Sequence, residues 1–266
     1  MEIRQPLLKI FQSCCQDPKS LSAKFKSICL IGVTGHGKSS TANSLCGEAE
    51  YFKTSSELES ETSKVRGLVT HAFGDEEEEP VIIIDTPGFG DSKGRDTEHI
   101  ANMVMNLKMI GYVDTFIITI NSQDPRFNEQ LESTIKLFSQ MFSTDFFHNV
   151  QVCFTRFGYD KKQVSNRKKG KSLDEGSLIE KMQDEFKNRF GCDLSEDQFA
   201  FIDNAVFDAE EGEIDEIEQK KYDEALDKIM EFTCNNEPFF CKDIKEVMKE
   251  KDALQRKILE LVEQGE

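Results

Sequence analysis

The chain has 266 residues, of which 38% are hydrophobic and 31% are charged, so it can bury a core and remain well solvated. Its net charge of −17 makes sequence-independent contact with nucleic acid unfavourable. No run approaches the roughly 18 apolar residues that a membrane-spanning helix needs. The eight cysteines form no Cys-x-x-Cys pair, and the first residues do not resemble a signal peptide. We therefore expect a cytoplasmic protein without a transmembrane anchor, and leave peripheral membrane contact open.

Apolar runs and helical patterns alternate along most of the chain. In order, they predict a helix over 3–25, a strand over 27–33, a helix over 38–47, strands over 65–73 and 81–85, a helix over 96–110, a strand over 115–120, a helix over 128–141, a strand over 150–155, a basic loop over 161–171, a helix over 178–190 and a strand over 199–203. From Glu213 onward only helical patterns are found. Apolar strands between helices are typical of a mostly parallel sheet with helices on both faces. The two strands that flank the acidic turn at Asp75–Glu79 predict one antiparallel edge strand.

A phosphate-binding motif connects the first of these strands to its helix. Residues 32–39 fit the pattern G-x-x-x-x-G-K-[ST]. In such a loop the backbone N–H groups and the helix N-terminus bind phosphate oxygens, while the lysine lies against the β- and γ-phosphates and the hydroxyl binds Mg²⁺. The predicted nucleotide contacts are Gly32, Thr34, Gly35, His36, Gly37, Lys38, Ser39 and Ser40. We expect the His36 side chain to point outward, as an exposed residue.

A second motif, Val81–Gly88, places Asp85 at the end of a buried strand. Its carboxylate can hold Mg²⁺ through water, and the N–H of Gly88 can meet the γ-phosphate. Phe89 follows where many Ras-type GTPases have a glutamine that orients water. A phenyl ring cannot do this, so we expect slow hydrolysis unless another group supplies the function.

These motifs together resemble the GTPases of immunity-associated proteins, the GIMAP family with its AIG-type G domain, in the branch of P-loop GTPases that includes septins and the chloroplast Toc receptors. The resemblance rests on GHGKSSTANSL, DTPGFGDS and the box Arg126–Gln130. It implies an α/β P-loop GTPase fold with extra N- and C-terminal helices, and GTP/GDP and Mg²⁺ as ligands. It also implies that Thr62, in a stretch similar to switch I, is a second Mg²⁺ ligand.

The guanine-reading segment departs from the family pattern. Thr155 and Arg156 match, but Phe157 replaces a lysine and Tyr159 stands where an aspartate belongs. Two alternatives remain open. Either Asp160, one residue later, reads the base after a small shift of the loop, or the base is recognised without it, with Arg156 and Phe157 flanking or stacking on the ring. The resemblance also assigns a guanine contact to Asn204.

Arg126 has two possible roles. By resemblance, it can reach the nucleotide of a partner subunit in a head-to-head dimer and stabilise the transition state. Alternatively, it is a helix N-terminal arginine that pairs with Glu129 or solvent. The basic segment 161–171 is expected to be a solvated loop, with contact to an acidic partner as the alternative.

Three segments are expected: an N-terminal helical extension (1–25), the G domain (26–208) and a C-terminal helical extension (209–266). The predicted function is a GTP/GDP switch with slow hydrolysis and nucleotide-dependent homodimerisation. Its catalytic set is Lys38, Thr62, Gly88 and Arg126, and its metal ligands are Ser39, Thr62 and Asp85. The alternatives are a GTP-dependent scaffold that scarcely hydrolyses and an ATP-using P-loop enzyme.

Overall fold

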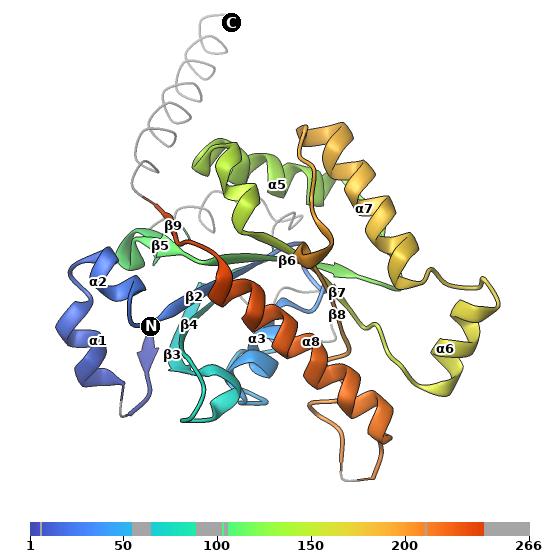
Figure 1. The fold of residues 1–266 in the computed structure, drawn as a ribbon, viewed down its shortest axis with the longest axis horizontal. Coiled ribbons are helices and arrows are strands. Elements are labelled where there is room, and N and C mark those ends of the chain that lie inside the picture. The colour runs from blue at the N-terminus through green and yellow to red at the C-terminus, as the bar shows by residue number, and fades with distance from the viewer. Residues whose placement is uncertain (6, 55–64, 89–102, 104–105, 211, 242–266) are drawn as a thin grey trace, which may run out of the picture.

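In the computed structural model, seven strands form a central sheet with helices on both faces (Figure 1). The structure describes residues 1–5, 7–54, 65–88, 103, 106–210 and 212–241. The strands of this sheet are β1 (Glu2–Ile3), β2 (Lys26–Ile31), β3 (Arg66–His71), β4 (Pro80–Asp85), β6 (Thr115–Asn121), β7 (Val150–Thr155) and β8 (Phe199–Ile202). Their order across the sheet is β1-β3-β4-β2-β6-β7-β8, and every neighbouring pair is parallel except β3 with β4. The predicted fold class, a mostly parallel sheet with helices on both faces, is confirmed. The predicted antiparallel strand is β3, but it is not the edge strand, because β1 lies beyond it.

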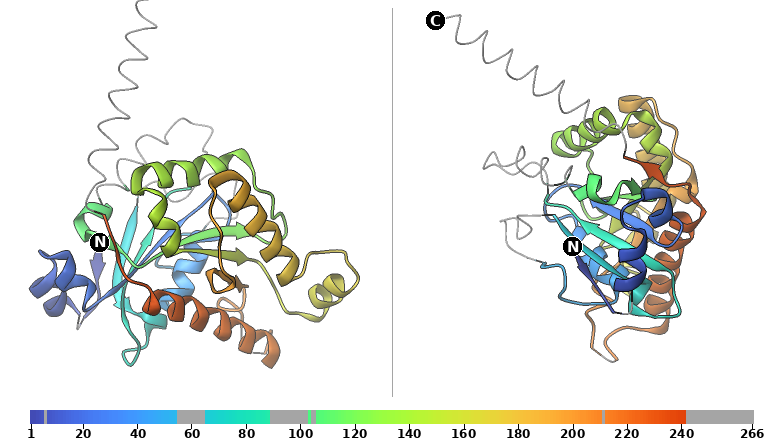
Figure 2. Two further views of the ribbon diagram at one scale, coloured as in Figure 1. Left: turned by 45° about the horizontal axis from the view of Figure 1, so that its top comes forward. Right: turned by 90° about the vertical axis from the view of Figure 1, so that its left-hand side faces the viewer.

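The helices lie in two layers, one on each face of the sheet (Figures 1 and 2). Within the described residues they include α1 (Leu8–Cys14), α2 (Pro18–Ser22), α3 (Lys38–Cys46), α5 (Glu129–Phe142), α6 (Lys161–Lys168), α7 (Glu175–Phe190) and α8 (Glu216–Asn235), with short 3-10 turns η1 (Ala72–Gly74), η2 (Thr144–Asn149) and η3 (Glu196–Gln198). Within the described ranges, none of these helices is long and apolar enough to cross a bilayer.

The alternation of side chains along the buried strands divides the core between these layers. In β2, Cys29 and Ile31 pack in the cluster that includes residues of α5 and α7, whereas Ile28 and Leu30 pack with α3 and α8. All four side chains are fully buried, and burial of an aliphatic side chain contributes roughly 1.5–3 kcal/mol. The sheet therefore holds β2, and the loop that follows it, between two packed faces.

The N-terminal segment differs from the single helix expected over 3–25. Residues Glu2 and Ile3 form β1, which pairs in parallel with β3 and so occupies the edge beyond the antiparallel pair. Two short helices follow. The second begins where Asp17 accepts hydrogen bonds from the N–H groups of Lys19 and Ser20, and Pro18 starts its first turn. A proline lacks the N–H that a continuous helix would need, which explains the break.

Two further expectations are wrong. The basic segment 161–171 is not a loop, because α6 occupies 161–168; Asp160 caps its N-terminus, and Arg167 and Lys168 lie in its last turn, where cations favour the helix dipole. The region after Glu213 also contains a strand, β9 (Phe239–Phe240), which pairs with β5 (Tyr112–Val113) in a separate two-stranded sheet.

The helix expected over 96–110 lies mostly outside the described residues. Of that range, residues 103 and 106–110 are described, and they are helical.

A buried carboxylate lies where β6 begins. Asp114 has no exposed surface; its Oδ2 accepts the N–H of Ser27 at 2.7 Å, and the Lys26 amine is 3.5 Å from its Oδ1. Burial is the largest influence and raises the pKa of Asp114 to about 6, although these two partners oppose it. The native state therefore binds this proton more tightly than the unfolded chain does.

A group with a raised native pKa stabilises the fold below its unfolded pKa, and this contribution is lost as pH rises through the native value. We expect the stability of the protein to fall between about pH 4 and pH 6 by up to about 3 kcal/mol from this group. Asp114→Asn keeps an acceptor for Ser27 but cannot ionise, so its unfolding free energy should lack this fall. Urea unfolding from pH 4 to pH 7.5 measures the difference; parallel pH profiles for the two proteins would contradict the prediction.

Candidate functional site

The predicted phosphate loop connects β2 to α3 in a conformation that requires glycine. Gly32, Gly35 and Gly37 have φ of +142°, +80° and +83°, values that residues with a Cβ rarely adopt. Gly37 is the N-cap of α3 and, as a glycine, offers no side chain to cap the first N–H groups of that helix. A helix start without a side-chain cap leaves its donors and its positive dipole end for an anion.

Lys38 supplies a buried positive charge at this helix start. Its side chain is 6% exposed, and its Nζ donates to the carbonyl oxygen of Val33 at 3.1 Å. Burial lowers the pKa of Lys38 to about 8, and the nearby Asp85 carboxylate opposes that effect. The amine is therefore mostly charged at neutral pH, and a phosphate oxygen is a better partner for it than a carbonyl.

Ser39 and Asp85 bring two hard oxygen atoms together. Ser39 Oγ donates to Asp85 Oδ2 at 2.7 Å, and Asp85 is completely buried at the end of β4. In an octahedral Mg²⁺ site with bonds of 2.0–2.1 Å, adjacent ligands lie about 2.9 Å apart. The hydroxyl and carboxylate oxygens thus fit a shared Mg²⁺ site, either directly or through water.

Two polar atoms in the loop are buried without a hydrogen-bond partner among the described residues: Thr34 Oγ1 and His36 Nδ1. His36 is half-buried, so the expectation that its side chain is exposed is wrong. Burial, and next the charge of Lys38, lower the pKa of His36, which favours the neutral ring. Unpartnered buried polar atoms are costly, and a polar ligand in the loop would satisfy them.

Gly88 packs directly against the phosphate loop. A Cβ on Gly88 would lie 2.1 Å from Thr34 Oγ1 and 2.7 Å from the backbone N of Thr34. The segment after β4 therefore touches the loop through backbone alone. This contact places Gly88 beside the loop, and the contact of its N–H with a γ-phosphate stays a prediction.

The ends of β7 and β8 adjoin the same loop. Thr155 Oγ1 donates to the carbonyl of His36 at 3.0 Å, and Arg156 Nη2 donates to the carbonyl of Gly35 at 3.3 Å. Phe157 is 2% exposed, with the Arg167 guanidinium 4.2 Å from its ring centre. The ring is thus already packed within the protein, and its contact with a base stays a prediction, whereas Arg156 is exposed beside the loop.

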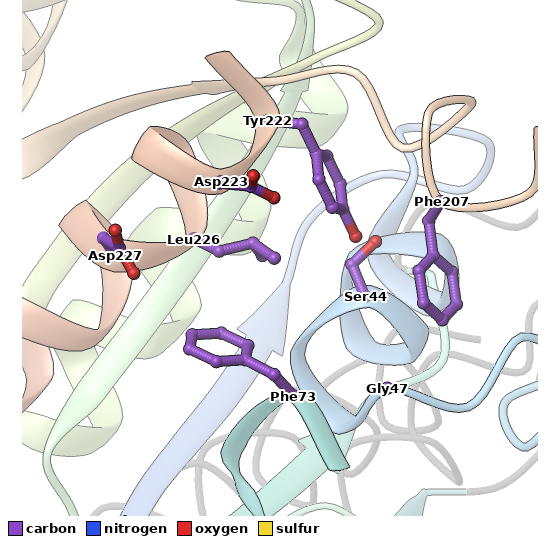
Figure 3. Close-up of a pocket in the computed structure, with 8 residues that line it drawn as sticks. All are labelled: Ser44, Gly47, Phe73, Phe207, Tyr222, Asp223, Leu226 and Asp227. Atoms are coloured by element: carbon purple, nitrogen blue, oxygen red, sulfur yellow. The ribbon is translucent and has the colours of Figure 1, made fainter. Parts of the chain in front are cut away.

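Asn204 is buried against α3. Its Nδ2 donates to Thr41 Oγ1 and its Oδ1 accepts from Ser44 Oγ, both at 2.9 Å. The hydroxyl of Tyr222, on α8, points toward Ser44 at one side of a pocket of about 300 Å³ between α3 and α8 (Figure 3). Both ends of the Asn204 amide are thus engaged with the helix that follows the phosphate loop, and its guanine contact stays a prediction.

Tyr159 and Asp160 both make hydrogen bonds within the protein. The Tyr159 hydroxyl donates to Glu175 Oε1 at 2.5 Å. Asp160 Oδ1 accepts the N–H groups of Lys162 and Gln163 at 2.9 and 3.1 Å, as the N-cap of α6.

Arg126 lies at the surface with its guanidinium paired to Asp124, rather than to Glu129 as expected. Its Nε is 2.6 Å and its Nη2 2.8 Å from the two carboxylate oxygens of Asp124. The pair borders a hollow of about 400 Å³ with Phe127 and Lys181. The side chain is 79% exposed, so it is accessible to another molecule.

Two predicted residues, Thr62 and Phe89, lie outside the described residues. The structure also shows site neighbours that the motif analysis missed, among them Thr41 and Asp203. The position of Asp203 gives a simple signal, because it lies at the carboxyl end of a parallel strand, where α/β proteins bind their ligands. Thr41 gives no such signal, since it lies within a helix.

The family model of the AIG1 family matches residues 26–167 of this chain. Among curated proteins of Arabidopsis thaliana, immune-associated nucleotide-binding protein 10 is 32% identical over 139 residues, which are 51% of this chain and 28% of that protein. Immune-associated nucleotide-binding protein 4 is 26% identical over 151 residues, 55% of this chain and 43% of that protein. The chain thus spans less than half the length of these relatives.

Solved structures of Toc33 from Arabidopsis thaliana share the fold. The structure of Toc33 with GDP and Mg²⁺ has a TM-score of 0.55 and 15% sequence identity, and the match covers 89% of this chain and 94% of that one. A structure from work on the importance of dimerization for the GTPase activity of atToc33 and psToc159 has a TM-score of 0.56 and 16% identity, with 88% and 91% covered. At these identities the likeness shows the fold.

The contact between Gly88 and Thr34 gives a stability test. In Gly88→Ala the new methyl group would meet backbone atoms that cannot rotate away, so we expect the unfolding free energy to fall by about 1–3 kcal/mol. Gly176→Ala is a suitable control, because Gly176 lies in the first turn of α7 and a Cβ there meets only Asp174 Oδ1 at 3.9 Å. That variant should be unchanged or up to about 1 kcal/mol more stable by urea unfolding. Equal stabilities for the two variants would argue against the packing described above.

Proposed function

Since this chain belongs to the AIG1 family, we propose that it is a guanine-nucleotide-binding switch that binds GTP and GDP with Mg²⁺ and hydrolyses GTP slowly. The family match confirms the resemblance to GIMAP-type G domains that the motifs indicate. The observation that carries the proposal is the buried Lys38 amine, which donates to a loop carbonyl at a helix start whose N-cap is a glycine.

Each part of the loop has a role in this proposal. The N–H groups at the start of α3 and the Lys38 amine bind the β- and γ-phosphates. Ser39 and Asp85 hold Mg²⁺, which neutralises charge on these phosphates, with Thr62 as the proposed further ligand. Thr62, through Mg²⁺, and Gly88, through its N–H, are held in place only while the γ-phosphate is present. Loss of this phosphate on hydrolysis releases both residues and resets the switch. An acidic protein can thus hold a polyanion through local dipoles, one lysine and a metal ion.

Known relatives of the same fold support the choice of ligands. Toc33, which shares the fold, has been solved with GDP and Mg²⁺ and with GMPPNP and Mg²⁺. We extend guanine nucleotide and Mg²⁺ to this chain because its loop, Ser39 and Asp85 provide the donors that both need.

We propose that hydrolysis depends on a homodimer formed across the nucleotide face. Phe89 occupies the place of a water-orienting residue, so a second molecule must supply what is missing. Arg126 is exposed and forms an ion pair with Asp124 on the same surface. Its guanidinium can therefore leave Asp124 and bind a phosphate held by the second molecule of the dimer. For Toc33, an arginine-to-alanine mutant is described as dimerization deficient, and dimerization is described as important for the GTPase activity of atToc33 and psToc159.

A scaffold that assembles with GTP but scarcely hydrolyses it is the second candidate. Phe89 favours this candidate, whereas the Lys38, Ser39 and Asp85 set favours the enzyme.

The organisation and location of the chain remain proposals. We propose the G domain over 26–208 with helical extensions over 1–25 and 209–266, and a cytoplasmic location. In support, the described part of the C-terminal extension includes α8, which shares a core with β2 and β8 and so is built onto the domain.

Nucleotide binding should depend on the loop side chains. Because a charge-assisted hydrogen bond contributes about 1.5–3 kcal/mol, Lys38→Ala should weaken GTP and GDP binding by about 10- to 100-fold. Ser39→Ala should mainly reduce the gain in nucleotide affinity that Mg²⁺ provides. Lys9→Ala, an exposed lysine on α1, is the matched control and should bind as the native protein does. Titration of fluorescent nucleotides with and without EDTA measures this, and tighter ATP than GTP binding would exclude guanine selectivity.

Hydrolysis should depend on protein concentration and on Arg126. In single-turnover assays, the rate per molecule should rise with concentration in the native protein and fall by at least about tenfold in Arg126→Ala. Lys136→Ala removes an exposed cation of α5 and should leave the rate unchanged. Phosphate release no higher than that of Lys38→Ala at every concentration would favour the scaffold instead.

A further inference from the structure

The carboxylate of Asp203 lies at the edge of the sheet where the phosphate loop is found. β7 and β8 are parallel neighbours, with Thr155 opposite Ile202. The residues that follow, Arg156 and Asp203, therefore leave the sheet side by side. Since Thr155 and Arg156 bond to the carbonyls of His36 and Gly35, this edge adjoins the loop. A nucleotide with its phosphates in the loop would extend along the carboxyl ends of these strands.

The Asp203 carboxylate has unused hydrogen-bonding capacity. Its Oδ1 accepts the N–H of Ala205 at 3.3 Å, whereas Oδ2 has no donor within the described part of the chain. Burial raises the pKa of Asp203; the charges of Asp160 and Glu218 add to this effect, and Arg156 opposes it. A half-buried carboxylate with a free oxygen is poorly satisfied in the unliganded protein and would gain from a ligand that offers N–H groups.

The loop after β7 packs closely against the Asp203 carboxylate. A Cβ on Gly158 would lie 2.7 Å from Asp203 Oδ2 and 2.3 Å from Gln163 Nε2. A larger residue at 158 would therefore displace the carboxylate or the Gln163 amide. Glycine at this position allows Asp203 to keep its place at the edge of the sheet.

Neighbouring polar groups are engaged to different extents. The Asn204 amide bonds to α3, and the Tyr159 hydroxyl bonds to Glu175. Asp160 Oδ1 accepts two N–H groups as the N-cap of α6, at 2.9 and 3.1 Å, whereas Asp203 Oδ1 accepts one, at 3.3 Å. Of these two carboxylates, Asp203 therefore gives up less on binding a base.

We propose that Asp203 is the specificity-determining residue for guanine, and that it accepts the N1–H and the 2-amino group of the base through its two oxygens. This inference rests on the proposed nucleotide-binding function. Guanine offers two adjacent donors on this edge, which match the two acceptors of a carboxylate. Adenine offers an acceptor at N1 and no 2-amino group, so it would leave the carboxylate unpaired or repelled. The missing aspartate at position 159 is thus replaced from the neighbouring strand.

The test is a change of base preference in the full chain. The native protein should bind GDP at least about 100-fold more tightly than xanthosine diphosphate, whose C2 oxygen is an acceptor. In Asp203→Asn the amide can donate to that oxygen, so GDP affinity should fall by about 100-fold and the preference should reverse. Calorimetric titration with both nucleotides measures these ratios, and thermal unfolding checks that the variant is folded. Loss of affinity for both nucleotides to the same extent, or an unchanged preference in the folded variant, would overturn the inference.

Two further variants separate the possible outcomes. Asp160→Asn retains a good N-cap for α6 and should leave the preference for GDP unchanged; a reversal there would assign base reading to Asp160 instead. Asp203→Ser removes the carboxylate with little bulk. It should abolish the preference for GDP over inosine diphosphate, which lacks the 2-amino group, and a preserved preference would contradict the proposal.

If the native protein binds no guanine nucleotide, the proposed function fails together with this inference. If it binds GDP and Asp203→Asn keeps the native preference, only the role of Asp203 fails.

Discussion

Close packing at three glycines is the constraint on which the site depends. Gly32 faces Thr119 of β6, where a Cβ would lie 2.9 Å from Oγ1, and Gly37 faces Thr155 of β7, with a Cβ 3.1 Å from the nearest side-chain carbon. Gly88 approaches the loop from beyond the end of β4, against Thr34. Because none of the three glycines has a side chain, β6, β7 and the segment after β4 can hold the loop in one shape, with Lys38 in place before any ligand binds.

The same arrangement explains how a protein with a net charge of −17 can hold a polyanion. Bulk charge acts over the whole surface and is screened by salt, whereas the loop acts over a few ångströms in a partly buried place. There Lys38 keeps its charge, the start of α3 adds its dipole, and Ser39 with Asp85 accommodates a metal ion. The acidic surface then repels other polyanions, but it does not prevent a phosphate from binding in the loop.

Much of the fold follows from the sequence because it depends on local pattern. Apolar strands such as Pro80–Asp85 and the motif around Lys38 predict their own structure, and the element order identifies a parallel sheet. The predictions of secondary structure fail where contacts with residues distant in the sequence determine the local conformation. Residues 2–3 become a strand only because β3 offers an edge, and Phe239–Phe240 only because β5 does. The segment 161–168 becomes a helix once Asp160 caps it, although no apolar stripe indicates one.

The sequence by itself determined the ligand class, because the phosphate loop is a continuous stretch whose glycines and lysine act on atoms within a few residues of each other. Only the tertiary structure decided which side chains lie together at the carboxyl ends of β7 and β8. That choice depends on the register between β7 and β8, 44 or more residues apart in the chain, which brings Asp203 next to Arg156 and turns Phe157 inward. The tertiary structure also decided that Asn204 bonds to α3. The bonded residues are some 160 positions apart in the chain, and no sequence pattern indicates a contact over that separation.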